Sequence, residues 1–165
     1  MRLVVVAAVS LLLPPTLLAQ DDTAAPKDSI IALIDRFLSA PRSNADLWSA
    51  IVDSARARSD VVVELTPHVV PWVCTARRRS AEGQALASLL VGAYVAGNMR
   101  AQLVSGLKKD EPQAGVDAVV RVYRAVRGRV LDFVDPTAEH WLVADSLGTL
   151  PALVDSLSHD YDPTC

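Results

Sequence analysis

The chain has little of what the best-known binding and catalytic motifs require. Two cysteines in 165 residues are too few for a disulfide-dense small scaffold or a four-cysteine zinc site. Seven glycines and ten prolines exclude collagen-like and low-complexity classes. The 16 Lys and Arg are outnumbered by 19 Asp and Glu, so the chain lacks the basic excess typical of nucleic-acid-binding proteins, and we expect no nucleic-acid partner. Its length suits one folded domain.

Motifs of nucleophilic and phosphate chemistry are also missing. The sequence contains no G-x-S-x-G or C-x-x-C motif and no glycine-rich phosphate loop that follows a strand. We therefore predict neither catalytic residues nor a cofactor, and expect that the protein is not an enzyme.

The first 19 residues have the pattern of a secretory signal peptide. Arg2 supplies positive charge, residues 3–13 form an apolar run broken only by Ser10, and Pro14-Pro15 interrupts it before a small residue, Ala19. The run is shorter than the ~20 apolar residues that span a bilayer. We expect cleavage after Ala19, export to a bacterial periplasm or the medium, and no membrane segment afterwards. Retention of the leader as a membrane tether is the alternative.

Beyond the leader we expect a disordered lead-in over residues 20–26 and a single helical domain over residues 27–165. An oxidising compartment would allow Cys74 and Cys165 to form a disulfide. By loop entropy such a bond contributes up to about 4 to 5 kcal/mol. Two free thiols or an intermolecular bridge are the alternatives.

Apolar residues recur with a helical period almost throughout the domain. Ile30, Ile34 and Leu38, for example, lie on one face of a helix that ends before Pro41. Period-2 runs and hairpin dipeptides are absent. This pattern predicts an all-α fold, a compact bundle of five to seven helices.

Local signals place several of the other helices. Residues 43–46 approximate a capping box and predict the start of a second helix that runs to near Arg58. The valine-rich residues 61–65 are expected to be a helical or an extended linker. Thr66-Pro67 predicts the start of a short helix, and Asp135-Pro136 predicts the start of another.

A long helix over residues 81–105 is predicted to form the centre of this bundle. Ser80 is a suitable N-cap and Gly106 a suitable left-handed C-cap. Residues 85–97 are apolar on nearly every side, so neighbours should enclose them. Gly92 and Gly97 lower one ridge, where another backbone can approach closely. The short connection to a second helix, residues 112–127, predicts an antiparallel pair.

Polar side chains on this buried helix are the candidate ligand-binding residues. Tyr94, Asn98 and Gln102 are spaced four residues apart, with Arg100 nearby. Buried amide and phenol groups need partners. They either line a pocket beside the glycine notch, where they orient a small ligand or a partner peptide, or they form an internal polar network or reach the surface where the helix leaves the core.

Basic runs supply weaker candidates. Arg77, Arg78 and Arg79 precede the central helix and are a candidate anion site, since backbone N–H groups also face anions there. A solvated loop is the alternative. Arg121, Arg124 and Arg127 follow one flank of the second helix, where we expect pairing with surface acids.

One pair has metal-ligand spacing. Asp155 and His159 are four residues apart near the C-terminus, with Asp160 and Asp162 beyond them. A solvated helix end is the alternative, because cationic His is favoured there by the helix dipole.

Taken together, these patterns predict an exported helical domain that is non-enzymatic and binds an envelope protein or a small ligand. A metal-assisted enzyme that uses His159, Asp155 and a distant acid or His140 is one alternative. A membrane-tethered periplasmic subunit is the other.

Overall fold

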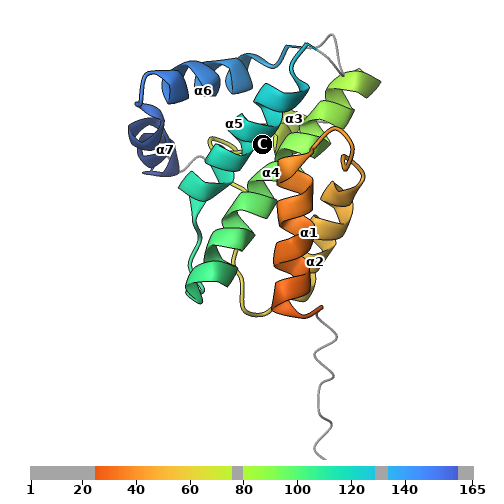
Figure 1. The fold of residues 1–165 in the computed structure, drawn as a ribbon. Coiled ribbons are helices and arrows are strands. Elements are labelled where there is room, and N and C mark those ends of the chain that lie inside the picture. Colours follow the sequence, from red (N-terminus) through yellow and green to blue (C-terminus); the bar gives the residue numbers. More distant parts are fainter. Residues whose placement is uncertain (1–24, 76–79, 129–133, 160–165) are drawn as a thin grey trace, which may run out of the picture.

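The computed structural model describes residues 25–75, 80–128 and 134–159, and these ranges form an all-α bundle of seven helices without a strand, as predicted (Figure 1). The helices are α1 (Lys27–Ser39), α2 (Leu47–Ala57), α3 (Trp72–Thr75), α4 (Ala81–Ser105), α5 (Pro112–Val126), α6 (Pro136–Ser146) and α7 (Leu150–His159). Among the helices of these ranges, none combines the length and hydropathy that a bilayer crossing requires.

Helix α4 is the centre of the bundle, and its ends are where the sequence predicts them. The Ser80 hydroxyl accepts a hydrogen bond from the Gly83 amide at 3.2 Å, which satisfies one free N–H of the first turn. At the other end Gly106 adopts a left-handed φ of 73°, a conformation that glycine reaches without a Cβ penalty. Helices α1, α2, α3 and α5 all pack against α4.

The small residues of α4 allow close approach as predicted, but on two sides rather than along one ridge. A Cβ at Gly97 would collide with the Ala114 backbone oxygen and the Ala118 side chain of α5. A Cβ at Gly92 would lie 2.5 Å from the Cβ of Trp48 in α2. Because glycine has no side chain at these two positions, α5 and α2 can pack directly against α4.

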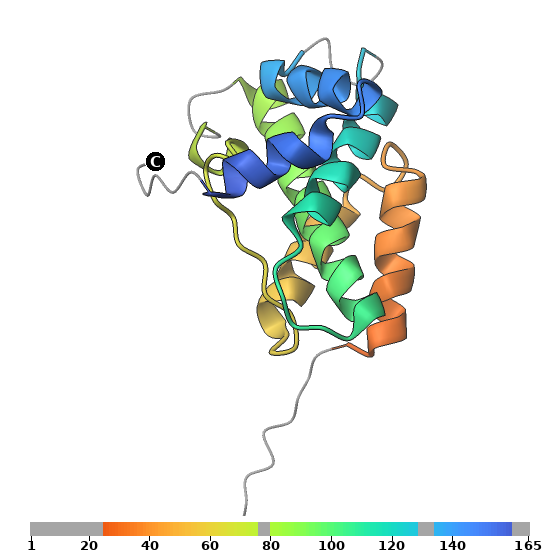
Figure 2. The same ribbon diagram turned by 90° about the vertical axis from the view of Figure 1, so that its left-hand side faces the viewer.

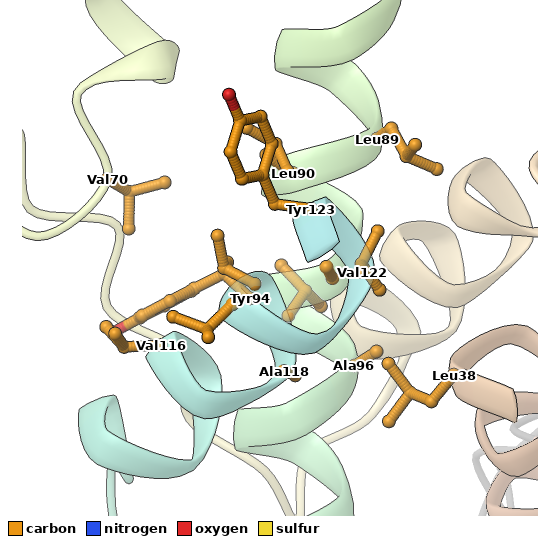
Figure 3. Packing of buried hydrophobic residues seen from close by; sticks show 14 of the residues in the cluster. Leu38, Val70, Leu89, Leu90, Tyr94, Ala96, Val116, Ala118, Val122 and Tyr123 are labelled. Atoms are coloured by element: carbon orange, nitrogen blue, oxygen red, sulfur yellow. The ribbon is translucent and has the colours of Figure 1, made fainter. Parts of the chain in front are cut away.

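Apolar side chains from three helices meet in the core between α1, α4 and α5. Figure 3 shows Leu38 of α1 near Ala96 of α4 and Val122 of α5. In Figure 1, α6 and α7 lie on the side of the α4–α5 pair opposite to α1 and α2, and both contact α5. Trp141 is the side chain through which α6 enters the core, with 1 % of it exposed.

Two segments differ from the sequence prediction. Asp46 is itself the N-cap of α2 without a side-chain hydrogen bond, and residues 41–46 form turns. There the Asn44 amide instead donates to the carbonyls of Arg36 and Ala40 at 3.2 and 3.0 Å, and so completes the end of α1. Residues 67–69 form a turn where a short helix was expected.

Residues 61–66 lack regular structure and run beside α4, as Figure 2 shows in yellow. An extended linker was one of the two conformations that the valine-rich sequence allowed. Its backbone groups need partners, because no helix or sheet supplies them.

Candidate functional site

The amide side chains of Asn98 and Gln102 supply those partners, and both are almost fully buried, with 0 % and 2 % exposed. The Gln102 oxygen accepts from the Val62 amide at 2.9 Å, and its nitrogen donates to the Val62 carbonyl and to Asn98 Oδ1. Gln102 therefore pairs with an extended backbone in the way a neighbouring strand would.

Asn98 connects the same network to the turn between α4 and α5. Its Nδ2 donates to Asp110 at 2.9 Å, and its Oδ1 accepts from the Glu111 amide at 3.2 Å. The Asp110 carboxylate also accepts from the Glu64 amide at 2.8 Å. The arrangement is the internal polar network that the sequence allowed, whereas ligand binding by Asn98 and Gln102 stays a prediction.

We expect Asn98→Leu to lower the free energy of unfolding by about 2 to 4 kcal/mol, because Gln102 and the Glu111 amide lose a buried partner. Urea unfolding followed by circular dichroism measures this effect. Gln113→Leu is the matched control, since Gln113 is another amide whose side chain bonds Asp117 at the surface, and it should change stability by less than about 0.5 kcal/mol. Equal losses in the two variants would contradict a structural role for Asn98.

Tyr94, the third predicted residue, lies among the core side chains between α4 and α5 (Figure 3). Its ring packs over Gly115, where an added Cβ would lie 2.6 Å from the ring. Burial, together with the nearby negative charge of Asp110, raises the pKa of the Tyr94 phenol far above its ordinary value. The phenol is therefore held neutral, and it is poorly suited to proton transfer near neutral pH.

Arg100, the fourth predicted residue, faces away from this network and lines an open cleft between α1, α4 and α5. The cleft has a volume of about 370 Å³ and lies beside Gly97. Small apolar residues and the buried side chain of Leu38 form its floor, and charged side chains form its rim. The lining residues are Asp35, Leu38, Gly97, Arg100, Ala101, Ala114, Asp117, Ala118 and Arg121.

Two rim charges neutralise each other. Arg100 Nε lies 2.6 Å from Asp35 Oδ1, and Nη2 reaches the second oxygen at 3.5 Å. This contact raises the pKa of Arg100 above its ordinary value. The pair joins α1 to α4 across one edge of the cleft and keeps both side chains in place.

The other rim arginine differs from its neighbours on α5. Arg124 pairs with Asp145 and Arg127 with Glu139, each at 2.6 Å, which confirms the expected pairing with surface acids for these two. Within the described part of the chain, Arg121 makes neither an ion pair nor a hydrogen bond. An unneutralised guanidinium at a cleft is available to a ligand.

A second buried polar cluster joins α3, α5 and α6, and the sequence analysis missed it. Asp135 is fully buried, and one carboxylate oxygen accepts from the Ala138 amide at 3.0 Å as the cap of α6. The other oxygen accepts from the Trp72 indole N–H, also at 3.0 Å. The Asp135-Pro136 pair predicted the helix start, but no local pattern predicts a partner 63 residues away.

Tyr123 extends this cluster to the surface. Its hydroxyl accepts from the Asp135 amide at 3.1 Å and donates to Glu139 at 2.8 Å. Burial and the Glu139 hydrogen bond raise the pKa of Tyr123 to about 12. Glu139 in turn contacts Arg127. Each group in the cluster thus has a structural partner, and the cluster joins helices rather than forming an open site.

The remaining predicted sites are only partly within the described residues. Asp155 and His159 are more than three-quarters exposed, with 3.8 Å between carboxylate and ring nitrogen, while Asp160 and Asp162 lie outside the described ranges. No group of three or more potential ligands gathers within those ranges. The metal site stays a prediction.

Two further predictions fall on undescribed residues. Arg77, Arg78 and Arg79 lie between the described ranges, so the anion site stays a prediction. Cys74 is half-buried in α3, but Cys165 lies outside the described residues, and their pairing also stays a prediction.

Comparisons with protein-family models, curated proteins and solved structures find no match to this chain.

Proposed function

We propose that the protein is an exported, non-enzymatic helical domain that binds a small ligand in the cleft between α1, α4 and α5. The observation that carries this proposal is the unneutralised guanidinium of Arg121 at the rim of a cleft whose opposite edge is fixed by the Arg100–Asp35 pair. Small-ligand sites are concave and place a few polar groups beside apolar surface, as the charged rim and the alanine floor of this cleft do.

The chemistry of the lining supports binding over catalysis. Among the described residues that line the cleft, none is a Ser, Thr, Cys or His. These side chains, together with Asp, Glu and Lys, supply most nucleophiles and general bases, and of all these types the described lining of the cleft contains only Asp35 and Asp117. The Arg100 guanidinium is already paired with Asp35, so both are suited to holding charge and shape rather than to exchanging protons.

Chemical-shift mapping tests the binding site directly. Isotope-labelled mature protein, titrated with a panel of small polar metabolites, should show ligand-dependent shifts at the amides of Gly97, Arg100 and Ala118. Ala101→Leu, which fills the cleft from its half-exposed floor, should abolish them. Shifts confined to another surface, or unaffected by Ala101→Leu, would contradict the proposed site.

A second groove provides the matched control. About 380 Å³ in volume, it lies between α6 and α7 and includes Ala152 in its lining. Ala152→Leu adds the same side chain to this groove and should leave ligand-dependent shifts at the first cleft unchanged.

Mass spectrometry of the protein from its native host tests export. A mature N-terminus near Gln20 in the envelope or medium is expected from the signal-peptide pattern. A chain that retains Met1 and sediments with membranes would contradict this part of the proposal and favour the tethered subunit.

A further inference from the structure

The charges around the cleft restrict the class of its ligand. Of the four charged lining residues, Asp35 and Arg100 form an ion pair with each other. Asp117 and Arg121 remain, four residues apart on α5, and both are exposed. Side chains at this spacing share one helix face, with about 5–6 Å between their Cβ atoms.

These two side chains do not neutralise each other. In the described residues no ion pair joins Asp117 to Arg121, and the recorded partner of Asp117 is the uncharged Gln113 amide at 2.7 Å. The cleft therefore presents one negative and one positive group whose charges are not cancelled by a direct contact.

A ligand of one charge is disfavoured by this pattern. A carboxylate bound to Arg121 alone lies near the Asp117 carboxylate, and a cation bound to Asp117 alone lies near the Arg121 guanidinium. A molecule that carries one positive and one negative charge can pair with both side chains, and it leaves the net charge of the rim at zero.

The floor and the size of the cleft define the rest of the molecule. Ala101, Ala114 and Ala118 present methyl groups, and beside them Gly97 allows the backbone of α5 to pack directly against α4. Such a floor accepts an aliphatic chain and offers no side-chain hydrogen bonds. A volume of about 370 Å³ is at the small end of ligand pockets, which hold roughly 300–1,000 Å³.

We infer that the cleft binds a small aliphatic zwitterion, with its carboxylate on Arg121, its ammonium group on Asp117 and its methylene chain on the alanine floor. This inference rests on the proposed function, because it names the ligand class of the same cleft. An ω-amino acid, whose two charges are separated by several methylenes, is the simplest molecule of this class.

Calorimetric titration of the mature protein with 4-aminobutyrate, butyrate and n-butylamine tests the inference. The three probes share a chain length and differ in charge. We expect 4-aminobutyrate to bind at least about tenfold more tightly than either singly charged probe, because each charge-assisted contact contributes about that factor. Arg121→Gln and Asp117→Asn should each weaken its binding by about tenfold or more.

Arg124→Gln is the matched control, because Arg124 is on the same helix and pairs with Asp145 away from the cleft. It should leave the affinity unchanged. Butyrate binding as tightly as 4-aminobutyrate, with loss on Arg121→Gln, would overturn the zwitterion and retain the cleft as an anion site. If none of the three probes binds and metabolites shift amide signals only at other surfaces, the proposal that the cleft binds a ligand would be overturned as well.

Discussion

Replacing Gly97 by valine is expected to cost about 3 kcal/mol or more of unfolding free energy and to lower Tm by roughly 10 °C. The position faces a backbone oxygen, that of Ala114, as well as the Cβ of Ala118. A flexible side chain could move aside, but the backbone in the first turn of α5 cannot move without shifting the helix. The loss therefore exceeds the gain in helix propensity, at most ~1 kcal/mol, that replacing a glycine in a helix normally brings.

Ala101→Val is the control for this substitution, since Ala101 is one turn further along α4 and half-exposed at the cleft. The same β-branched side chain there should cost under about 1 kcal/mol, mainly helix propensity. Thermal and urea unfolding of the two variants make the comparison. A Gly97→Val protein as stable as Ala101→Val would mean that α5 does not rest on the glycine notch.

The bundle itself could be predicted because its determinants are local. Ser80 and Gly106 delimit α4 by capping rules that act within one turn, and the structure places both caps as expected. The turn of residues 106–111 is short enough to require an antiparallel partner. Periodicity alone did not locate the start of α2, because Asn44 is recruited to the end of α1.

The candidate site could be predicted only in part, since it depends on which face of α4 each side chain occupies once its neighbours are in place. Four polar residues were chosen from one helix, and the structure separates them. Gln102 faces the linker at Val62 and Asn98 faces the α4–α5 turn, whereas Arg100 faces α1 and the cleft. Arg121 and Arg124 lie on the same flank of α5, so the sequence alone does not distinguish them. The structure does, because α6 supplies Asp145 as a partner for Arg124.

Long-range polar contacts explain how short, poorly structured segments keep their places in this bundle. Gln102 holds the linker of residues 61–66, and Asp135 holds α3, an element of four residues. Neither segment is long enough to be stable alone. Each is anchored by one buried polar side chain from a neighbouring element. Replacing either side chain should therefore clearly lower the free energy of unfolding.

Asp135→Ala is accordingly expected to lower the free energy of unfolding by about 3 to 4 kcal/mol. Loss of the cap of α6 accounts for about 1 kcal/mol, and the indole N–H of Trp72, left buried without its charged acceptor, accounts for about 2 to 3 kcal/mol. Urea unfolding measures the loss. Trp72 packs edge-on against Trp141, with ring centroids 5.3 Å apart, so tryptophan fluorescence reports the same change locally.

The conservative variant Asp135→Asn separates the two contributions. Its single amide oxygen can accept from the Ala138 amide or from Trp72, and its NH₂ group then faces the other donor. We expect a loss of about 2 to 3 kcal/mol, most of the alanine effect, because a donor facing a donor satisfies neither. A double-mutant cycle with Trp72→Phe should give a coupling energy of about 1.5 kcal/mol or more. Additive losses would show that Asp135 stabilises the protein through its helix cap alone and that α3 is held by packing.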